Sequence, residues 1–534
     1  MAKTFQDYCD ELAKKFLQTV VVVDDRASYG EDLLEPVLNL NPPGRDNGNV
    51  GDVDLAANAE TRQQQGLDAK CLIDACANQG LVCAILRPGQ GEDPIPTTIQ
   101  AAVRSDILVL DWDMNGDGGD SAMSIIRRII EQGGGYRTRL VVIYAGQGDI
   151  LDIISSIIRN LDDAGLDTGL LDDTGYTLTC GSMRITAFAK AHVLLALPER
   201  RVPESELPVR LIKEFSMITT GLLSCVAVAA LSAIRDNTHK LLSRISTDLD
   251  APYLAHRAML PIPDDAKRQA AALVAGEICS ILDESEIGRI ADIKNILLWL
   301  HAQREKGILF DKRFELPPGN NPVEDVCTLL TLGCGSDGLP DHLKKHRKSP
   351  HKSNLAGKFC YYIDNGKGLD NTFACLTTTQ TRYLRPQPQL SLGQVISRTL
   401  GRVKSFWLCI QPMCDSERIV GERAFPLLPL SAVDEDKPFD LVVEVNTGQF
   451  IKLKIRNKPY ACQMVTFRAD PVTETVVAQR HSQGYYYHDA QGQTYKWIAE
   501  LKSEYALNIV HQYSAEASRI AFDPSEWLRR WSRE

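Results

Sequence analysis

Five short, mostly apolar runs occur in the first 190 residues, and a charged or turn-forming residue follows each of them directly or one position later. A continuous apolar run bounded by turn residues is typical of a strand buried on both faces. The segments around these runs have the apolar periodicity of amphipathic helices. Alternating strands and helices predict an α/β fold with a doubly wound parallel sheet. The predicted strands are Val20–Val23, Leu81–Leu86, Ile107–Leu110, Leu140–Tyr144 and Arg184–Ala189, and the predicted helices are 5–16, 67–78, 121–132 and 149–160.

The pattern changes twice beyond residue 202. Pro203–Pro208 predicts a linker, and the strong patterns that follow are helical. After a polar connector the apolar positions alternate, which predicts strands, and Asn446-Thr447-Gly448 is a hairpin signal. The predicted strands are Phe406–Ile410, Asp440–Val445, Phe450–Ile455 and Gln463–Phe467, with helices at Thr494–Ser514 and Pro524–Trp531.

These patterns predict three domains. An α/β domain spans 1–202, with insertions at about 26–65 and 160–182. An all-α domain spans 209–310, and an α+β domain of unknown role spans 320–534. A chain of 534 residues exceeds what one hydrophobic core normally serves, which agrees with several domains.

Charge and cysteine content narrow the classes of function. The net charge of −10 argues against nucleic acid as the main partner. Fourteen cysteines without a CxxC pair are typical of reduced thiols in a cytoplasmic protein. The charged, amphipathic N-terminus does not resemble a signal peptide. Met217–Ile234 carries no charge but is short for a membrane span, so we expect a buried helix and no membrane association.

Carboxylates follow two of the predicted strands. Asp24 and Asp25 follow the first strand, and Asp111 and Asp113 follow the third. Because the carboxyl ends of parallel strands share one edge of a sheet, these acids are expected to converge there. They would repel one another unless a divalent cation or a shared proton lay among them. Lys190 follows the last of the predicted strands and is expected at the same edge.

Two interpretations of the Asp111-x-Asp113 pattern fit poorly. An EF-hand loop requires a bidentate Glu at its twelfth position, where this chain has Ala122. A phosphatase of the haloacid-dehalogenase type would use Asp111 as nucleophile and Asp113 as acid or base. In that family the metal-binding acidic pair lies C-terminal to the nucleophile, whereas the pair here lies N-terminal to it.

An acidic pair after the first strand, an Asp after the third and a Lys after the last resemble the receiver domain of response regulators. The resemblance covers about Phe16–Val193. It implies that Asp111 accepts a phosphoryl group from the phosphohistidine of a sensor histidine kinase. It also implies Mg²⁺ held by Asp25, Asp111 and the backbone carbonyl of Asp113, with Asp24 acting through water. Lys190 would pair with the phosphoryl oxygens.

The sequence departs from the receiver pattern in three places. Ala145 stands where receivers carry Thr or Ser at the end of the fourth strand, and alanine cannot hydrogen-bond a phosphoryl group. Ala191 stands where a Pro is usual, and the loop after Asp25 is some forty residues longer than usual. The missing hydroxyl is expected to affect the conformational change that follows phosphorylation more than phosphorylation itself.

The helical segment Glu214–Arg244, following a receiver with insertions, is similar to proteins of Detocs-type anti-phage systems. In those systems a sensor kinase phosphorylates receiver proteins, of which one carries a toxic effector and another acts as a phosphate sink. The resemblance implies a phosphate buffer rather than a turnover enzyme, with a second receiver-bearing effector as a possible partner. Two alternatives stay open, a receiver-controlled effector with an unrecognised C-terminal activity and a phosphatase of the haloacid-dehalogenase type. Docking of an acidic partner on the basic run Leu343–Lys352 also stays open.

Overall fold

The computed structural model divides into two compact units, Met1–Lys306 and Gly307–Glu534. The domain boundaries predicted at 202, 209, 310 and 320 stay predictions. The structure describes residues 3–29, 66–89, 91–133, 139–146, 149–166, 168–193, 196–305, 322–344, 366–383, 386–434, 437–518 and 525–531. Most of the predicted insertion at 26–65 and of the basic run lies outside these ranges.

A seven-stranded sheet organises the first unit, in the order β2-β1-β3-β4-β7-β6-β5. Five of its strands are parallel and match the five predicted ones. They are β1 (Thr19–Val23), β2 (Val82–Leu86), β3 (Ile107–Leu110), β4 (Arg139–Ala145) and β7 (Met183–Ala189). This arrangement confirms the α/β fold class, and every residue of β3 and β4 is buried.

Two antiparallel strands extend the sheet beyond the predicted ones. β6 (Thr177–Cys180) pairs with β7, and β5 (Leu170–Leu171) pairs with β6. They lie in the segment predicted as an insertion, where the sequence TLTC contains no apolar run that would indicate a strand. The sheet is therefore mostly parallel rather than wholly parallel.

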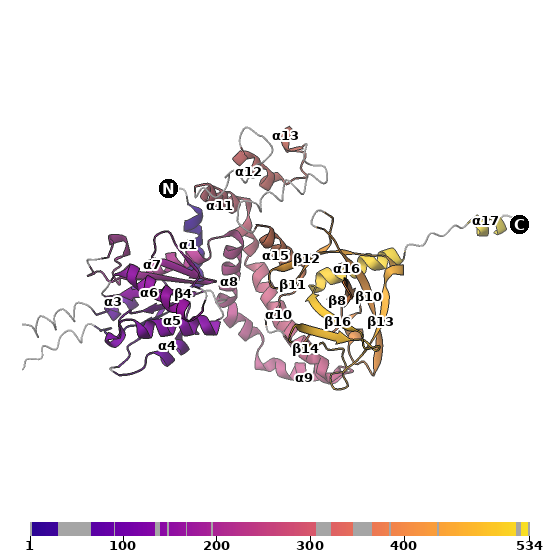
Figure 1. The fold of residues 1–534 in the computed structure, drawn as a ribbon, viewed down its shortest axis with the longest axis horizontal. Helices are drawn as coiled ribbons and strands as arrows, with labels where there is room; N and C mark the ends of the chain where they lie inside the picture. The colour runs from indigo at the N-terminus through magenta and orange to yellow at the C-terminus, as the bar shows by residue number, and fades with distance from the viewer. Residues whose placement is uncertain are drawn as a thin grey trace, which may run out of the picture. The chain divides into compact units, whose positions relative to one another are not determined.

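Helices cover both faces of this sheet (Figure 1). α4 (Ile95–Ala102), α5 (Asp120–Gly133) and α6 (Ile150–Asp163) bury apolar side chains in the core on one face. α1 (Phe5–Phe16), α3 (Ala69–Asn78) and α7 (Leu207–Ile218) do so on the other. Sequence patterning missed α4, which has only eight residues, follows Pro94 and has no side-chain cap hydrogen bond.

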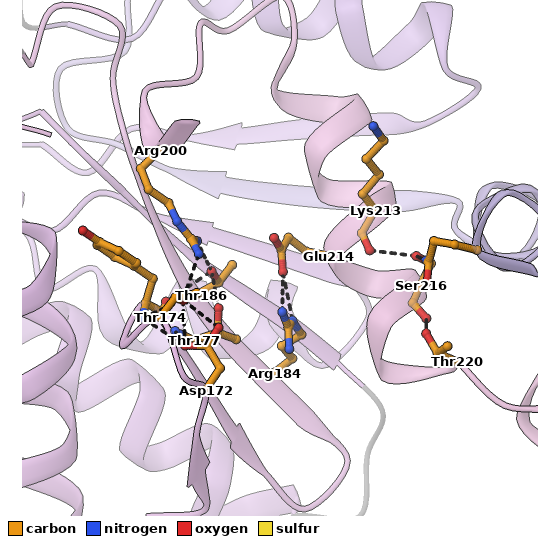
Figure 2. Close-up of polar contacts among 12 residues, drawn as sticks. Asp172, Thr174, Thr177, Arg184, Thr186, Arg200, Lys213, Glu214, Ser216 and Thr220 are labelled. Carbon is orange, nitrogen blue, oxygen red and sulfur yellow. Dashed lines mark hydrogen bonds and ion pairs between the residues drawn. The ribbon is translucent and has the colours of Figure 1, made fainter. Parts of the chain in front are cut away.

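Polar contacts hold α7 and the segment that carries Arg200 against the sheet (Figure 2). The Arg184 guanidinium on β7 lies 2.8 Å from a carboxylate oxygen of Glu214 on α7, which ties this helix to the sheet. The Arg200 guanidinium lies over the ring of Tyr176, 4.5 Å from its centroid, and donates to the Thr174 and Thr186 hydroxyls. These contacts hold the antiparallel extension against β7.

Among the described residues from 219 to 305, the regular elements are helices and short 3₁₀ turns, as predicted. The helices are α8 (Leu222–Arg244), α9 (Asp250–Met259), α10 (Ala266–Glu284) and α11 (Ile293–Glu305). Arg235 of α8 donates to buried Asp106 at 2.7 Å, and Cys225 Sγ lies 3.5 Å from Cys9 Sγ of α1. The uncharged segment Met217–Ile234 is split between the end of α7 and the start of α8, and Met217, Leu223 and Leu231 are exposed, so the prediction of one buried helix is wrong. None of the described helices is long and apolar enough to cross a membrane.

The second unit contains a nine-stranded antiparallel sheet that confirms a C-terminal α+β fold. Its strands are β8 (Gln394–Leu400), β9 (Val403–Cys409), β10 (Glu422–Ala432), β11 (Leu441–Asn446), β12 (Gln449–Ile455), β13 (Gln463–Arg468), β14 (Gln479–His481), β15 (Gly484–His488) and β16 (Thr494–Glu500). The predicted hairpin joins β11 to β12. The helices of this unit are α12 (Pro322–Leu332), α13 (Asp341–Lys344), α15 (Gly366–Thr378), α16 (Ser503–Ala517) and α17 (Ser525–Trp531).

One prediction in this unit is wrong. Residues 494–500 were expected to begin a helix, but they form β16, and the helix α16 begins at Ser503. The sequence TYKWIAE has the β-branched and aromatic residues that favour strands, and it pairs with β8 and β15. The strand contacts on both sides therefore override the helical periodicity.

Candidate phosphoacceptor site

The parallel pairing of β1, β3, β4 and β7 brings the predicted site residues to one edge of the sheet. Val23 pairs with Leu110, so Asp24 and Asp111 continue from neighbouring strand ends. Ala145 pairs with Ala189 on β7, so Lys190 follows at the same edge. The acids and the lysine come from segments up to 166 residues apart in the chain.

Lys190 is buried between two carboxylates. Its Nζ lies 2.7 Å from Asp24 Oδ2 and 3.5 Å from Asp111 Oδ1, and its side chain is 1% exposed. Burial acts to lower the pKa of Lys190, but the negative charges of Asp24 and Asp111 prevail and raise it. The ammonium group therefore stays charged inside the protein.

Asp24, Asp25 and Asp111 form an acidic cluster, with one carboxylate oxygen from each lying within 4.8 Å of the others. Burial raises the pKa of Asp111 to about 7, and the charges of Asp24 and Asp25 add to the increase while Lys190 opposes it. Three acids at this spacing carry more negative charge than one lysine can neutralise. The cluster thus favours either a proton or an added cation.

An orphaned oxygen tests whether the cluster fits a magnesium ion. Within the described part of the chain, Asp25 Oδ1 is buried and has no hydrogen-bond partner. Asp25 Oδ2 accepts from the backbone N–H of Asn115 at 3.0 Å, which orients the carboxylate. A buried carboxylate oxygen without a donor, next to two other carboxylates, is a suitable environment for a hard divalent cation.

Asp113 contributes differently from the three clustered acids. Its carboxylate oxygens accept from the Arg26 guanidinium at 3.2 Å and from the backbone N–H of Gly118 at 3.0 Å. The bond from the Gly118 N–H closes the turn that carries the backbone carbonyl predicted to bind the metal. The side chain of Asp113 is not one of the three clustered carboxylates.

Arg26 is the site residue that sequence reasoning missed. Its Nε lies 3.9 Å from Asp25 Oδ2, and its backbone N–H donates to Asp24 Oδ1 at 2.8 Å. Its position directly after the acidic pair was the available signal, because a cation at that point of the loop is close to both carboxylates.

A glycine sets the shape of the turn after Asp111. A Cβ on Gly119 would lie 2.3 Å from the Trp112 ring, and the Gly119 φ of +103° is unfavourable for other residues. The Trp112 ring therefore packs directly on the backbone at Gly119. This contact fixes the start of α5 relative to Asp111.

The end of β4 lacks a hydroxyl, as predicted. Ala145 is 1% exposed, and its carbonyl accepts from the backbone N–H of Lys190 at 2.9 Å. The methyl side chain leaves this strand end without a side-chain donor.

Comparison with protein families agrees with this geometry. Residues 16–194 match the family model of the response receiver domain. No curated protein matches the chain. Residues 16–194, which contain the sheet, the helices α3 to α6 and the acidic edge, therefore constitute a receiver domain, the phosphoacceptor module of two-component signalling. Such a domain works with a phosphodonor, of which histidine kinases are the general type.

Proposed function

We propose that this protein accepts a phosphoryl group on Asp111 from a phosphohistidine of a sensor histidine kinase. The observation that supports this most strongly is the buried meeting of Asp111 with Asp24, Asp25 and Lys190 at one sheet edge. A lone strand-end aspartate would be repelled by an incoming phosphoryl group. Here the buried Lys190 ammonium group lies beside Asp111, and the acidic cluster offers a place for an added cation.

The transfer exchanges one bond to phosphorus for another. An oxygen of the ionised Asp111 carboxylate attacks the phosphorus, and the bond between phosphorus and the histidine nitrogen breaks. The electron pair of that bond stays on the nitrogen, which takes a proton as the histidine leaves. Lys190 supplies a positive charge beside the new acyl phosphate. Asp25, Asp111 and the Asp113 carbonyl, with Asp24 nearby, would hold Mg²⁺, which neutralises charge on the phosphoryl oxygens.

Asp111→Asn is expected to abolish phosphorylation of the full chain by phosphoramidate and Mg²⁺. This small donor carries the same phosphorus–nitrogen bond as phosphohistidine, and an amide is too weak a nucleophile to replace the carboxylate. Intact-mass measurement should show one added phosphoryl group on the wild type and none on the variant. Asp163→Asn, at an exposed end of α6, is the matched control. Equal labelling of the wild type and Asp111→Asn would contradict the assignment.

The resemblance to Detocs-type systems supports a finer proposal, a phosphate buffer in an anti-phage pathway in the cytoplasm. Ala145 agrees with storage rather than relay, because it offers the phosphoryl group no hydroxyl that could move on phosphorylation. A phosphate sink would take phosphoryl groups from a kinase that also serves a receiver-bearing effector.

Ala145→Thr tests this finer proposal. We expect phosphorylated wild type to show hydrogen exchange near β4 and α6 that is unchanged from the unmodified protein. The threonine variant should show altered exchange there once phosphorylated, because its hydroxyl can follow the phosphoryl group. An equally large change in the wild type would argue for a relay and hence for the effector alternative. Continued release of phosphate over many turnovers would instead favour a phosphatase.

A further inference from the structure

Arg26 has a position that neither the receiver resemblance nor the proposed function explains. Its guanidinium lies 3.2 Å from Asp113 Oδ2 and 3.9 Å from Asp25 Oδ2. The Arg26 side chain is 30% exposed, whereas those of Asp25 and Asp113 are 11% and 13% exposed. The cation therefore lies on the solvent side of the acidic cluster and reaches inward to it.

Lys190 and Arg26 contact different acids of the site. Lys190 neutralises Asp24 and Asp111 from the buried side, where solvent cannot replace it. Arg26 contacts Asp25 and Asp113, which border the place where a divalent cation fits. The positive charge of Arg26 would repel a divalent cation added to the acidic cluster. Because this site is partly buried, the repulsion is screened less than it would be in water.

We propose that Arg26 is a resident counter-ion that weakens the binding of Mg²⁺ to the acidic cluster. It stabilises the cluster when no metal is bound, and it sets the Mg²⁺ concentration at which the site fills. The inference concerns the metal site of the proposed phosphoacceptor, but it depends only on the cluster binding a divalent cation. It therefore survives if Asp111 proves not to be phosphorylated.

A positioning role for Arg26 would predict the opposite effect on Mg²⁺ binding. If Arg26 instead held Asp25 and Asp113 in the geometry that the metal needs, its removal would weaken Mg²⁺ binding. A counter-ion and a positioning residue thus differ in the sign of the effect. Measuring the affinity for the metal alone distinguishes them without any phosphodonor.

The test is calorimetric titration of the full chain with Mg²⁺ in the absence of phosphodonor. It is carried out at alkaline pH so that Asp111 is ionised in every variant. Arg26→Gln should lower the dissociation constant about threefold to tenfold, because one repelling charge is removed at close range. Arg26→Lys keeps the charge and should stay within about twofold of the wild type. Increasing salt should shrink the difference between Arg26→Gln and the wild type.

Arg127→Gln is the matched control. Arg127 lies on α5 with a side chain that is 50% exposed, and it pairs with Glu131 at 2.8 Å. This variant changes the net charge of the chain by the same amount without touching the acidic cluster, so its Mg²⁺ affinity should equal that of the wild type. Unchanged or weaker Mg²⁺ binding by a folded Arg26→Gln variant would overturn the proposal. Circular dichroism of both arginine variants verifies that they fold.

Discussion

Replacement of Lys190 by methionine is expected to lower the free energy of unfolding by about 3–5 kcal/mol in metal-free solution. Methionine fills a similar volume but leaves Asp24 and Asp111 buried beside each other without their shared cation. The ion pair itself contributes little net stability, since burying its charges is costly. Breaking it is costly wherever Asp111 is ionised, because the charges of Asp24 and Asp111 then stay buried without their cation.

Urea unfolding of the full chain in the presence of a chelator measures this loss. Hydrogen exchange of the β1 and β3 amides then shows whether the loss of stability lies in the receiver domain, because it reports on these strands separately from the second unit. Lys240→Met, an exposed position on α8, is the control and should change stability by less than about 0.5 kcal/mol. Addition of Mg²⁺ should recover part of the loss in Lys190→Met, because a cation in the cluster offsets the missing charge. A loss below about 1 kcal/mol would show that Lys190 is not the main counter-ion.

The strand ends that carry Asp24, Asp111 and Lys190 were predictable from the sequence because each is marked by a change from apolar to charged residues. Parallel strands must place their carboxyl ends at one edge, so Asp24, Asp111 and Lys190 could be assigned to one site before their distances were known. The same logic did not find Arg26, because a loop residue has no fixed direction until the loop folds. Its contact with Asp113 joins two loops whose shapes depend on the whole sheet edge.

The errors elsewhere have a common physical origin. β6 and β16 lack the patterns of buried parallel strands, and both are defined by antiparallel pairing, β6 with the neighbouring β7 and β16 with the distant β8. α4 is short and begins without a cap, so its helicity depends on packing of Ile99 and Ala102 against the core. Local periodicity indicates an element only where it agrees with the tertiary contacts, and at these segments the contacts decide.

The metal-free protein is expected to lose stability as the pH rises from about 5 to about 8, by about 2–3 kcal/mol. The pKa of Asp111 is raised from 3.8 to about 7, mainly by burial. Between these two values the folded state binds a proton that the unfolded state has released, so protonation favours folding. As the pH rises through the folded-state pKa this contribution is lost, and an ionised carboxylate is left buried beside Asp24 and Asp25.

Urea midpoints in the presence of a chelator, measured across this pH range, test the prediction with Asp111→Asn as the reference. The amide cannot ionise, so the difference in stability between the wild type and the variant isolates the contribution of this carboxyl group. The free energy of unfolding of Asp111→Asn, relative to that of the wild type, should rise by about 2–3 kcal/mol between pH 5 and pH 8. Saturating Mg²⁺ should reverse the trend, because the cation favours the ionised carboxylate and binds more tightly as protons leave. A pH-independent difference between the two proteins would mean that Asp111 is already ionised at pH 5, and the acidic cluster would then need no cation beyond Lys190 and Arg26.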